Sequence, residues 1–392
     1  MTRRLSKLFL ILSAFTLLTG CWDYKDIQDI HYVTTLGVDY LDGKYEVYVQ
    51  LVDLSGVAKQ ENKSTEPGKV YVGKHSGKSI AEAINHLYQS AQQRLYLGQV
   101  STFVLTDRAL KHNINDIIDA AFRYNLIRYS SNIFATNKPL KELFAIKGFF
   151  NLTPLYSELH FPKAVYENIS YIKPISLRTF ISTYRDVSIT TILPTISFSE
   201  KDWTEDKKKR RTFMIDGAFV LYYKKSLNWY SIDDLKGLRW VTEDTNRTPL
   251  EFKKGDGTNY ISLSHPKVKI KPFIKDNEAK YNLDIHINGS ILEMSNTEPL
   301  KNFENVVQDY IRKEIEKTYK IGLKRNGDPL GLGRTLYRKE LKFWQAKGFK
   351  EPNDYLKGNS IDQINITVNL TNAGTLDYHP FKSSKLPGND GK

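Results

Sequence analysis

The feature of the sequence that most constrains the chain is its N-terminal segment, which has the pattern of an export signal. Three basic residues, Arg3, Arg4 and Lys7, precede an apolar run from Leu8 to Leu18. A cationic start, an apolar run of about 10 residues and small residues at the exit are typical of an export signal. The run is too short to span a bilayer comfortably, since a span takes about 20 apolar residues. The pattern predicts that the rest of the chain folds outside the cytoplasmic membrane.

The apolar run ends in Leu18, Thr19 and Gly20 before Cys21, and this exit resembles the lipobox of bacterial lipoproteins. In such a signal the small residues fit a peptidase cleft, and the cysteine thiol receives a diacylglyceryl group before cleavage. We therefore predict a signal peptide over residues 1–20 and lipidation of Cys21 by fatty acids such as palmitate. An uncleaved anchor helix and a chance cysteine in an ordinary signal are the alternatives. Residues 21–30 would then be a lipidated tether, of which Trp22–Ile30 at 3.3–3.6 Å per residue reaches no more than roughly 30 Å.

Composition indicates a globular protein after the signal. The chain has 392 residues, 40% of them hydrophobic and 12% aromatic, which is enough for two or three domains. Cys21 is the only cysteine, so neither an internal disulfide nor a cysteine metal site is expected. The net charge of +13 suggests attraction to anionic lipid headgroups rather than to nucleic acid, which an exported protein rarely meets. A solvated lysine-rich surface is the alternative.

The region 31–199 is predicted to be an N-terminal α+β region, with two subdomains. It begins with a hairpin over His31–Asp53, because alternating apolar residues flank the turn sequence Asp42-Gly43. Strand and helix patterns then alternate up to about residue 135. The hairpin can share a sheet with strands after residue 212, which would make the first domain discontinuous.

Two further regions complete the predicted architecture. A charged loop over Glu200–Arg211 is the clearest internal boundary, and it opens a middle module of hairpin and helix at 200–250. Residues 251–381 are predicted to be a C-terminal α+β domain with a long helix over 300–321, and 382–392 a disordered tail. The predicted fold class is α+β, with three modules that each contain a mainly antiparallel or mixed sheet and flanking helices. Two modules, one of them subdivided, would also account for the pattern.

The sequence offers no catalytic, cofactor or metal motif. The segment Gly73–Ser79 imitates a phosphate-binding loop, but its two glycines are four residues apart where five are needed. We interpret it as a turn before a helix capped by Ser79 and Glu82. The eight histidines lack the helical spacing of a zinc site, and neither a GxSxG nor an SxxK motif is present. We therefore predict a protein that is not an enzyme and binds no cofactor or metal. The sequence leaves open a pair of carboxylates, distant from each other in the chain, that acts as in a glycosidase.

Two basic segments are candidates for contact with a partner or a membrane. Lys207–Arg211 holds five consecutive basic residues, for which a solvated loop is the alternative. Gln308–Lys350 holds twelve basic and five acidic residues with aromatic residues between them. This second segment is either an interaction face or an ordinary pair of amphipathic helices.

Segments spread in order along essentially the whole chain resemble the Ger(x)C family, the lipoprotein C subunits of spore germinant receptors. The segments that carry the resemblance are Gly20-Cys21-Trp22-Asp23 with Leu36-Gly37-Val38-Asp39, Gly77-Lys78-Ser79-Ile80, Ile192-Leu193-Pro194, Asp216-Gly217-Ala218-Phe219-Val220, Leu238-Arg239-Trp240, and Asp328 with Gly331 and Trp344.

The resemblance implies a three-domain α+β protein that is lipid-anchored to the outer face of the spore's inner membrane. It implies a complex with integral-membrane A and B subunits and a role in triggering germination when nutrients appear. The only residue that it assigns a role is Cys21, as the lipidation site. Whether a nutrient touches this subunit or acts on it indirectly stays open. The alternative is an extracytoplasmic solute-binding lipoprotein of a transporter, which would need two similar lobes around a hinge.

Overall fold

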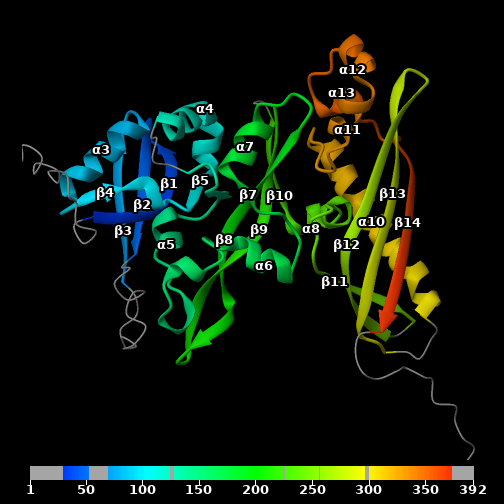
Figure 1. The fold of residues 1–392 in the computed structure, drawn as a ribbon, viewed down its shortest axis with the longest axis horizontal. Coiled ribbons are helices and arrows are strands. Elements are labelled where there is room, and N and C mark those ends of the chain that lie inside the picture. The colour runs from blue at the N-terminus through cyan, green and yellow to red at the C-terminus, as the bar shows by residue number, and fades with distance from the viewer. Residues whose placement is uncertain are drawn as a thin grey trace, which may run out of the picture.

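The computed structural model describes residues 30–52, 69–123, 128–223, 226–255, 257–295 and 300–372. These residues form two β-sheets with flanking helices (Figure 1), so the predicted α+β class is confirmed. The division into three modules stays a prediction. The signal, Cys21 and the tail at 382–392 lie outside the described residues.

The first sheet is mixed. Its strand order is β10-β9-β8-β6-β5-β1-β2-β3, with β4 beside β1 and β7 beside β6. The strands are β1 (Ile30–Leu41), β2 (Lys44–Val52), β3 (Val70–Gly77), β4 (Arg94–Tyr96), β5 (Thr102–Thr106), β6 (Asn132–Thr136), β7 (Ile175–Ser176), β8 (Thr190–Glu205), β9 (Lys208–Tyr222) and β10 (Ser226–Ser231). The hairpin predicted at Asp42-Gly43 is present, and both turn residues have the positive φ that its tight turn requires.

Helices cover both faces of this sheet. One face packs against α3 (Ile80–Ser90), α4 (Asp107–Arg123) and α7 (Leu177–Tyr184). The other packs against α5 (Leu140–Phe144) and the segment that follows it. That segment contains the short helices η3 (Phe149–Asn151), η4 (Pro154–Tyr156) and α6 (Pro162–Asn168), while η2 (Leu97–Gln99) lies between β4 and β5. Both faces are buried because the central strands run parallel, and parallel strands are usually covered on both sides.

The predicted loop over Glu200–Arg211 is wrong. The segment is the outer end of the β8–β9 hairpin, where Trp203 pairs with Arg210 and Thr204 with Lys209. The chain turns at Asp206 and Lys207, both with positive φ. Charge density misled the prediction, because a two-stranded ribbon that projects into solvent needs backbone pairing but no apolar face.

The second sheet has the order β11-β12-β13-β14 and is covered on one face by a long helix (Figure 1). Its strands are β11 (Thr248–Lys254), β12 (Gly257–Lys275), β13 (Glu278–Glu293) and β14 (Ile361–Asn372). The long helix α10 (Leu300–Lys324) begins where the sequence predicted and extends three residues further. The shorter helices of this half are α8 (Ile232–Leu235), α9 (Leu238–Val241), α11 (Leu332–Lys339), α12 (Leu341–Lys347) and α13 (Pro352–Tyr355).

Helix α10 presents two stripes of inward-facing residues. The first packs on the sheet and repeats every four residues: Phe303, Val307, Ile311, Ile315 and Tyr319. The second lies beside it and holds Tyr310, Glu314 and Thr318, the last two of which meet α8 and α9. No helix in the described ranges is both long and apolar enough to cross a bilayer.

Candidate functional site: a polar joint between the two sheets

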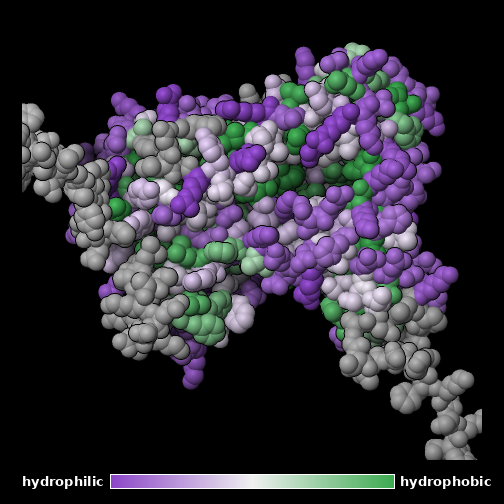
Figure 2. Space-filling model, viewed as in Figure 1, coloured by the Kyte–Doolittle hydropathy of each residue, from purple (hydrophilic) through white to green (hydrophobic). Residues whose placement is uncertain are grey.

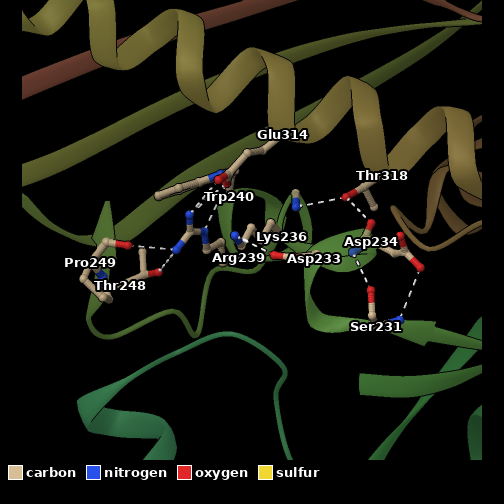
Figure 3. Close-up of polar contacts among 11 residues, drawn as sticks. Ser231, Asp233, Asp234, Lys236, Arg239, Trp240, Thr248, Pro249, Glu314 and Thr318 are labelled. Atoms are coloured by element: carbon tan, nitrogen blue, oxygen red, sulfur yellow. Dashed lines mark hydrogen bonds and ion pairs between the residues drawn. The ribbon is translucent and has the colours of Figure 1, made fainter. Parts of the chain in front are cut away.

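The two halves of the molecule are joined through α8 and α9, which follow β10 of the first sheet and pack against α10 of the second (Figure 3). The contact is close at Gly237, which lies between the two short helices. A Cβ atom there would lie 2.7 Å from the carbonyl oxygen of Glu314 and 2.8 Å from the Cα atom of Ile315. Only glycine therefore allows this approach without a shift of α10.

Arg239 is the centre of the joint. Its side chain is only 2% exposed, and all three guanidinium nitrogens donate hydrogen bonds. Nη2 donates to both carboxylate oxygens of Glu314 at 2.9 Å, and Nε donates to Oε2 at 3.2 Å. Nη1 donates to Thr248 Oγ1 and to the carbonyl oxygen of Pro249, each at 2.9 Å. One guanidinium therefore links α9, α10 and the start of β11.

Trp240 closes the joint on its apolar side. Its buried indole donates from Nε1 to Glu314 Oε2 at 2.6 Å, and the Arg239 guanidinium lies 4.4 Å from its ring centroid. Glu314 thus accepts from two neighbouring residues of α9. A carboxylate that accepts hydrogen bonds from a guanidinium and an indole has a fixed orientation, since both donors are rigid planar groups.

A second set of contacts lies one turn further along α10. Thr318 Oγ1 accepts from the backbone N–H of Gly237 at 3.0 Å and donates to the carbonyl oxygen of Asp234 at 2.8 Å. Asp234 also completes a capping box with Ser231 at the start of α8, and its carboxylate accepts from Arg325 at 3.2 Å. The joint therefore spans more than two turns of α10.

The polar contacts of this joint connect the two halves of the molecule structurally. Its carboxylates are held in ion pairs, and Arg239 and Trp240 are buried with their N–H groups bonded. A buried ion pair with satisfied hydrogen bonds fixes geometry more than it adds net stability. We conclude that the joint holds the two halves in one orientation and offers no free nucleophile or base.

A cavity of about 680 Å³ lies at the carboxyl ends of the parallel strands β1, β5 and β6. Most of its charged side chains are paired: Arg108 donates to both oxygens of Asp39, Lys74 lies 2.7 Å from Glu46, and Lys111 lies 2.7 Å from Asp107. Burial alone would raise the pKa of Asp39, but hydrogen bonds from Arg108 and Thr106 outweigh it and lower the pKa. These ionised pairs neutralise one another across the cavity.

The other sites weighed from the sequence lie apart from the joint. Gly73–Gly77 belongs to β3, paired along its length with β2, so the segment is a strand where we predicted a turn and has no loop to cradle a phosphate. Ser79 caps α3 as predicted, accepting from the backbone N–H of Glu82 at 3.1 Å. Within the described ranges, no group of three or more His, Asp or Glu side chains could hold a metal ion. Cys21 lies outside these ranges.

The basic segment 308–350 divides between core and surface. Trp344 and Tyr319 are buried in the core of the second half, so they do not form an exposed aromatic face. Glu314 and Asp328, two of its five acidic residues, are also turned inward. The segment is therefore an amphipathic set of helices whose accessible side is more basic than the sequence count suggests.

Sequence reasoning missed the pair Arg239–Glu314. The available signal was Glu314 itself, a carboxylate within the apolar stripe of a helix, where a charge needs a partner. The partner lies 75 residues earlier in the chain, so no local pattern could have identified it.

Most of the chain matches known proteins. Residues 23–198 match the model of the spore germination protein N-terminal domain, and residues 216–374 match that of the spore germination B3/GerAC-like C-terminal region. The chain belongs to the Ger(x)C family. Spore germination protein KC of Bacillus subtilis (strain 168) is 22% identical to it over 92% of this chain and 94% of the relative. Spore germination protein B3 of the same organism is 20% identical over 95% and 98%. The crystal structure of the GerBC protein has the same fold, with a TM-score of 0.54 and 16% identity, covering 86% of this chain and 96% of that one.

Two of the segments that resemble the Ger(x)C family meet at the joint. Leu238-Arg239-Trp240 forms the first three residues of α9. Gly217 of the segment Asp216–Val220 pairs with Ser231 at the end of β10, and a Cβ atom on it would lie 2.2 Å from the carbonyl oxygen of Tyr230. These segments therefore position the strand and the helix that hold the second half of the molecule.

Proposed function

We propose that this chain is a non-enzymatic lipoprotein subunit of a spore germinant receptor. It is held at the outer face of the membrane by diacylglyceryl on Cys21, contacts integral-membrane A and B subunits, and helps nutrients trigger germination. The observation that carries the proposal is the match of both halves of the chain to spore germination models, together with the lipobox at Cys21.

The joint supports a role through protein contact. A rigid body made of two packed halves can present surfaces from both to its neighbours in fixed relation. The saturated hydrogen bonds of Arg239 and Glu314 suit such a body better than a hinged binding protein, whose lobes must rotate.

The anchor is tested by Cys21→Ala. We expect the variant chain to fold but to incorporate no labelled fatty acid and to leave the membrane fraction after signal removal, because the thiol that carries the lipid is gone. The wild-type chain is the control, and circular dichroism checks the fold. Undiminished lipid labelling of the variant would show that the anchor is misassigned.

The complex is tested by native detergent extraction of spore membranes followed by crosslinking and mass identification. We expect two multi-spanning proteins to co-purify with the chain. Solitary behaviour would contradict the proposal. A solute-binding lipoprotein would instead show strong thermal stabilisation by one small molecule from a nutrient panel, since a ligand raises stability by RT ln(1 + [L]/Kd).

A further inference from the structure

Three exposed aromatic side chains lie together at the outer end of the β8–β9 hairpin: Trp203 belongs to β8, and Phe149 and Phe150 belong to the short helix η3. Phe150 is 90% exposed, Trp203 56% and Phe149 37%. The ring centroids of Phe149 and Trp203 are 5.2 Å apart, and those of Phe149 and Phe150 are 6.1 Å apart. We call these three residues the aromatic tip. In Figure 2 hydrophobic surface lies beside the lower end of the hairpin, with hydrophilic atoms at its extreme end.

The aromatic tip is held in place by its backbone and by one arginine. Arg210 donates to the carbonyl oxygen of Gly148, and its guanidinium lies 4.7 Å from the ring centroid of Phe149. Phe150 has φ +53°, a left-handed conformation that is costly for a bulky residue. The structure therefore presents this phenylalanine to solvent instead of burying it, which is the opposite of what the hydrophobic effect favours in a lone chain.

Several lysines near the aromatic tip have no ion-pair partner within the described residues, so their charges can interact with a ligand. Exposed ammonium groups with no ion pair in the described ranges belong to Lys147, Lys201, Lys207, Lys208 and Lys209. The carboxylates of Glu200 and Glu205 are engaged by Arg211 and Arg210, whereas the exposed Asp202 and Asp206 have no ion pair within the described residues. Five unpaired lysines therefore face two unpaired carboxylates. The accessible charge around the rings is therefore positive.

We propose that the aromatic tip docks on an anionic lipid surface. Aromatic rings favour the boundary between headgroups and acyl chains, and each basic residue near an anionic membrane adds to the electrostatic attraction. A protein partner explains the composition less well, because lysine is depleted in protein interfaces whereas polybasic segments are typical of lipid contact. The proposal rests on the membrane-side location given under the proposed function and adds a second contact to the anchor.

The experiment places an environment-sensitive dye on a cysteine introduced by Phe150→Cys. The full chain is reconstituted in vesicles of phosphatidylcholine with one third phosphatidylglycerol, and a blue shift and quenching by acyl-chain-labelled lipid are measured. The matched control is Leu341→Cys on α12, another exposed apolar residue (41% exposed), which has Lys339 and Lys342 as near neighbours in the chain. We expect insertion of the dye at 150, none at 341, and at least a tenfold smaller inserted fraction when Lys207, Lys208 and Lys209 are changed to glutamate or when phosphatidylglycerol is omitted.

Each other outcome overturns the proposal. Equal insertion at both positions would mean nonspecific adsorption. A dye that stays in water on vesicles but becomes buried in native spore membranes would assign the aromatic tip to a protein partner. Flotation of the chain with the vesicles, scored separately, reports the anchor, so failure of the tip is distinguished from failure of the proposed lipidation. The side chains of the three lysines are exposed, so the charge reversal does not threaten the fold.

Discussion

Replacement of Glu314 by alanine is expected to loosen the joint between the two halves. The change removes the acceptor of three hydrogen bonds from Arg239 and one from Trp240. The guanidinium, 2% exposed, would keep only its bonds to Thr248 and Pro249. Breaking a buried ion pair by removing one partner costs about 3–5 kcal/mol, because it leaves an uncompensated charge in the interior. Glu314 is 18% exposed, so water can enter beside the truncated side chain and we expect the lower end, about 3 kcal/mol.

The assay is thermal unfolding combined with hydrogen exchange. At about 2–4 °C per kcal/mol for a body of 150–250 residues, the loss corresponds to roughly 6–12 °C in the Tm of the less stable half. Amides of α8 and α9 should lose protection first, since these helices contain only four residues each and depend on α10 for their stability.

The matched control is Glu316→Ala on the same helix. Glu316 is 43% exposed and lies 3.6 Å from Lys320, an exposed pair worth at most about 0.5 kcal/mol. The double variant Arg239→Met with Glu314→Leu should recover part of the loss, because it removes both charges and keeps the volume but leaves the buried Nε1–H of Trp240 without its acceptor. If Glu314→Ala differs from Glu316→Ala by less than about 1 kcal/mol, the ion pair does not hold the joint.

The remaining predictions concern pH and packing. Burial raises the pKa of Glu158 to about 7 and lowers that of His160 to about 4. Between about pH 4.5 and 7 the folded chain therefore holds a proton on Glu158 that the unfolded chain releases, so this group makes the free energy of unfolding fall as pH rises. Between about pH 4 and 6.5 His160 is neutral in the folded chain and protonated in the unfolded one, so this group makes the free energy of unfolding rise with pH. Urea titrations should show that Glu158→Gln removes the first slope and His160→Gln the second; parallel pH curves for wild type and variant would contradict this. Gly237→Ala places a Cβ atom 2.7 Å from the backbone of α10 and should cost about 1–3 kcal/mol, while Gly358→Ala, with no atom within 4 Å, should be near neutral. Asp328→Ala removes the acceptor of two buried N–H groups at the start of α11 and should cost about 1–3 kcal/mol in the same titrations.

The sequence predicted best where a local pattern decides the structure. Ile364, Ile366, Val368 and Leu370 alternate with polar residues, the period-2 pattern of a strand, and β14 contains all four. The turn chemistry of Asp42-Gly43 fixed the first hairpin for the same reason, since only certain residues accept two positive φ angles in succession.

The sequence predicted poorly where distant segments meet. The first sheet brings β1 beside β5 and β6 beside β8, pairings that depend on crossovers and not on local pattern. The end of the β8–β9 hairpin was predicted to be a loop because amino-acid composition does not reveal backbone pairing. Helix α3 ends at Ser90, and Leu95 lies in β4, parallel to β1, a pairing that the local pattern does not indicate.

The aromatic tip and the joint are connected by a single strand. Strand β9 begins at Lys208 beside the tip, and its far end contributes to three cores: Phe219 to that of the first sheet, Val220 to the cluster around α8, and Tyr222 to that of the second half. A displacement of this strand along its axis would therefore disturb the packing of all three cores. Glu314→Ala weakens α9 but leaves the β8–β9 pairing intact, so it tests whether membrane insertion of the aromatic tip depends on the joint. In that variant the dye at position 150 should still insert, while the amides of α9 lose their protection from hydrogen exchange. Loss of both together would show that the tip is positioned by the joint and not by its own hairpin.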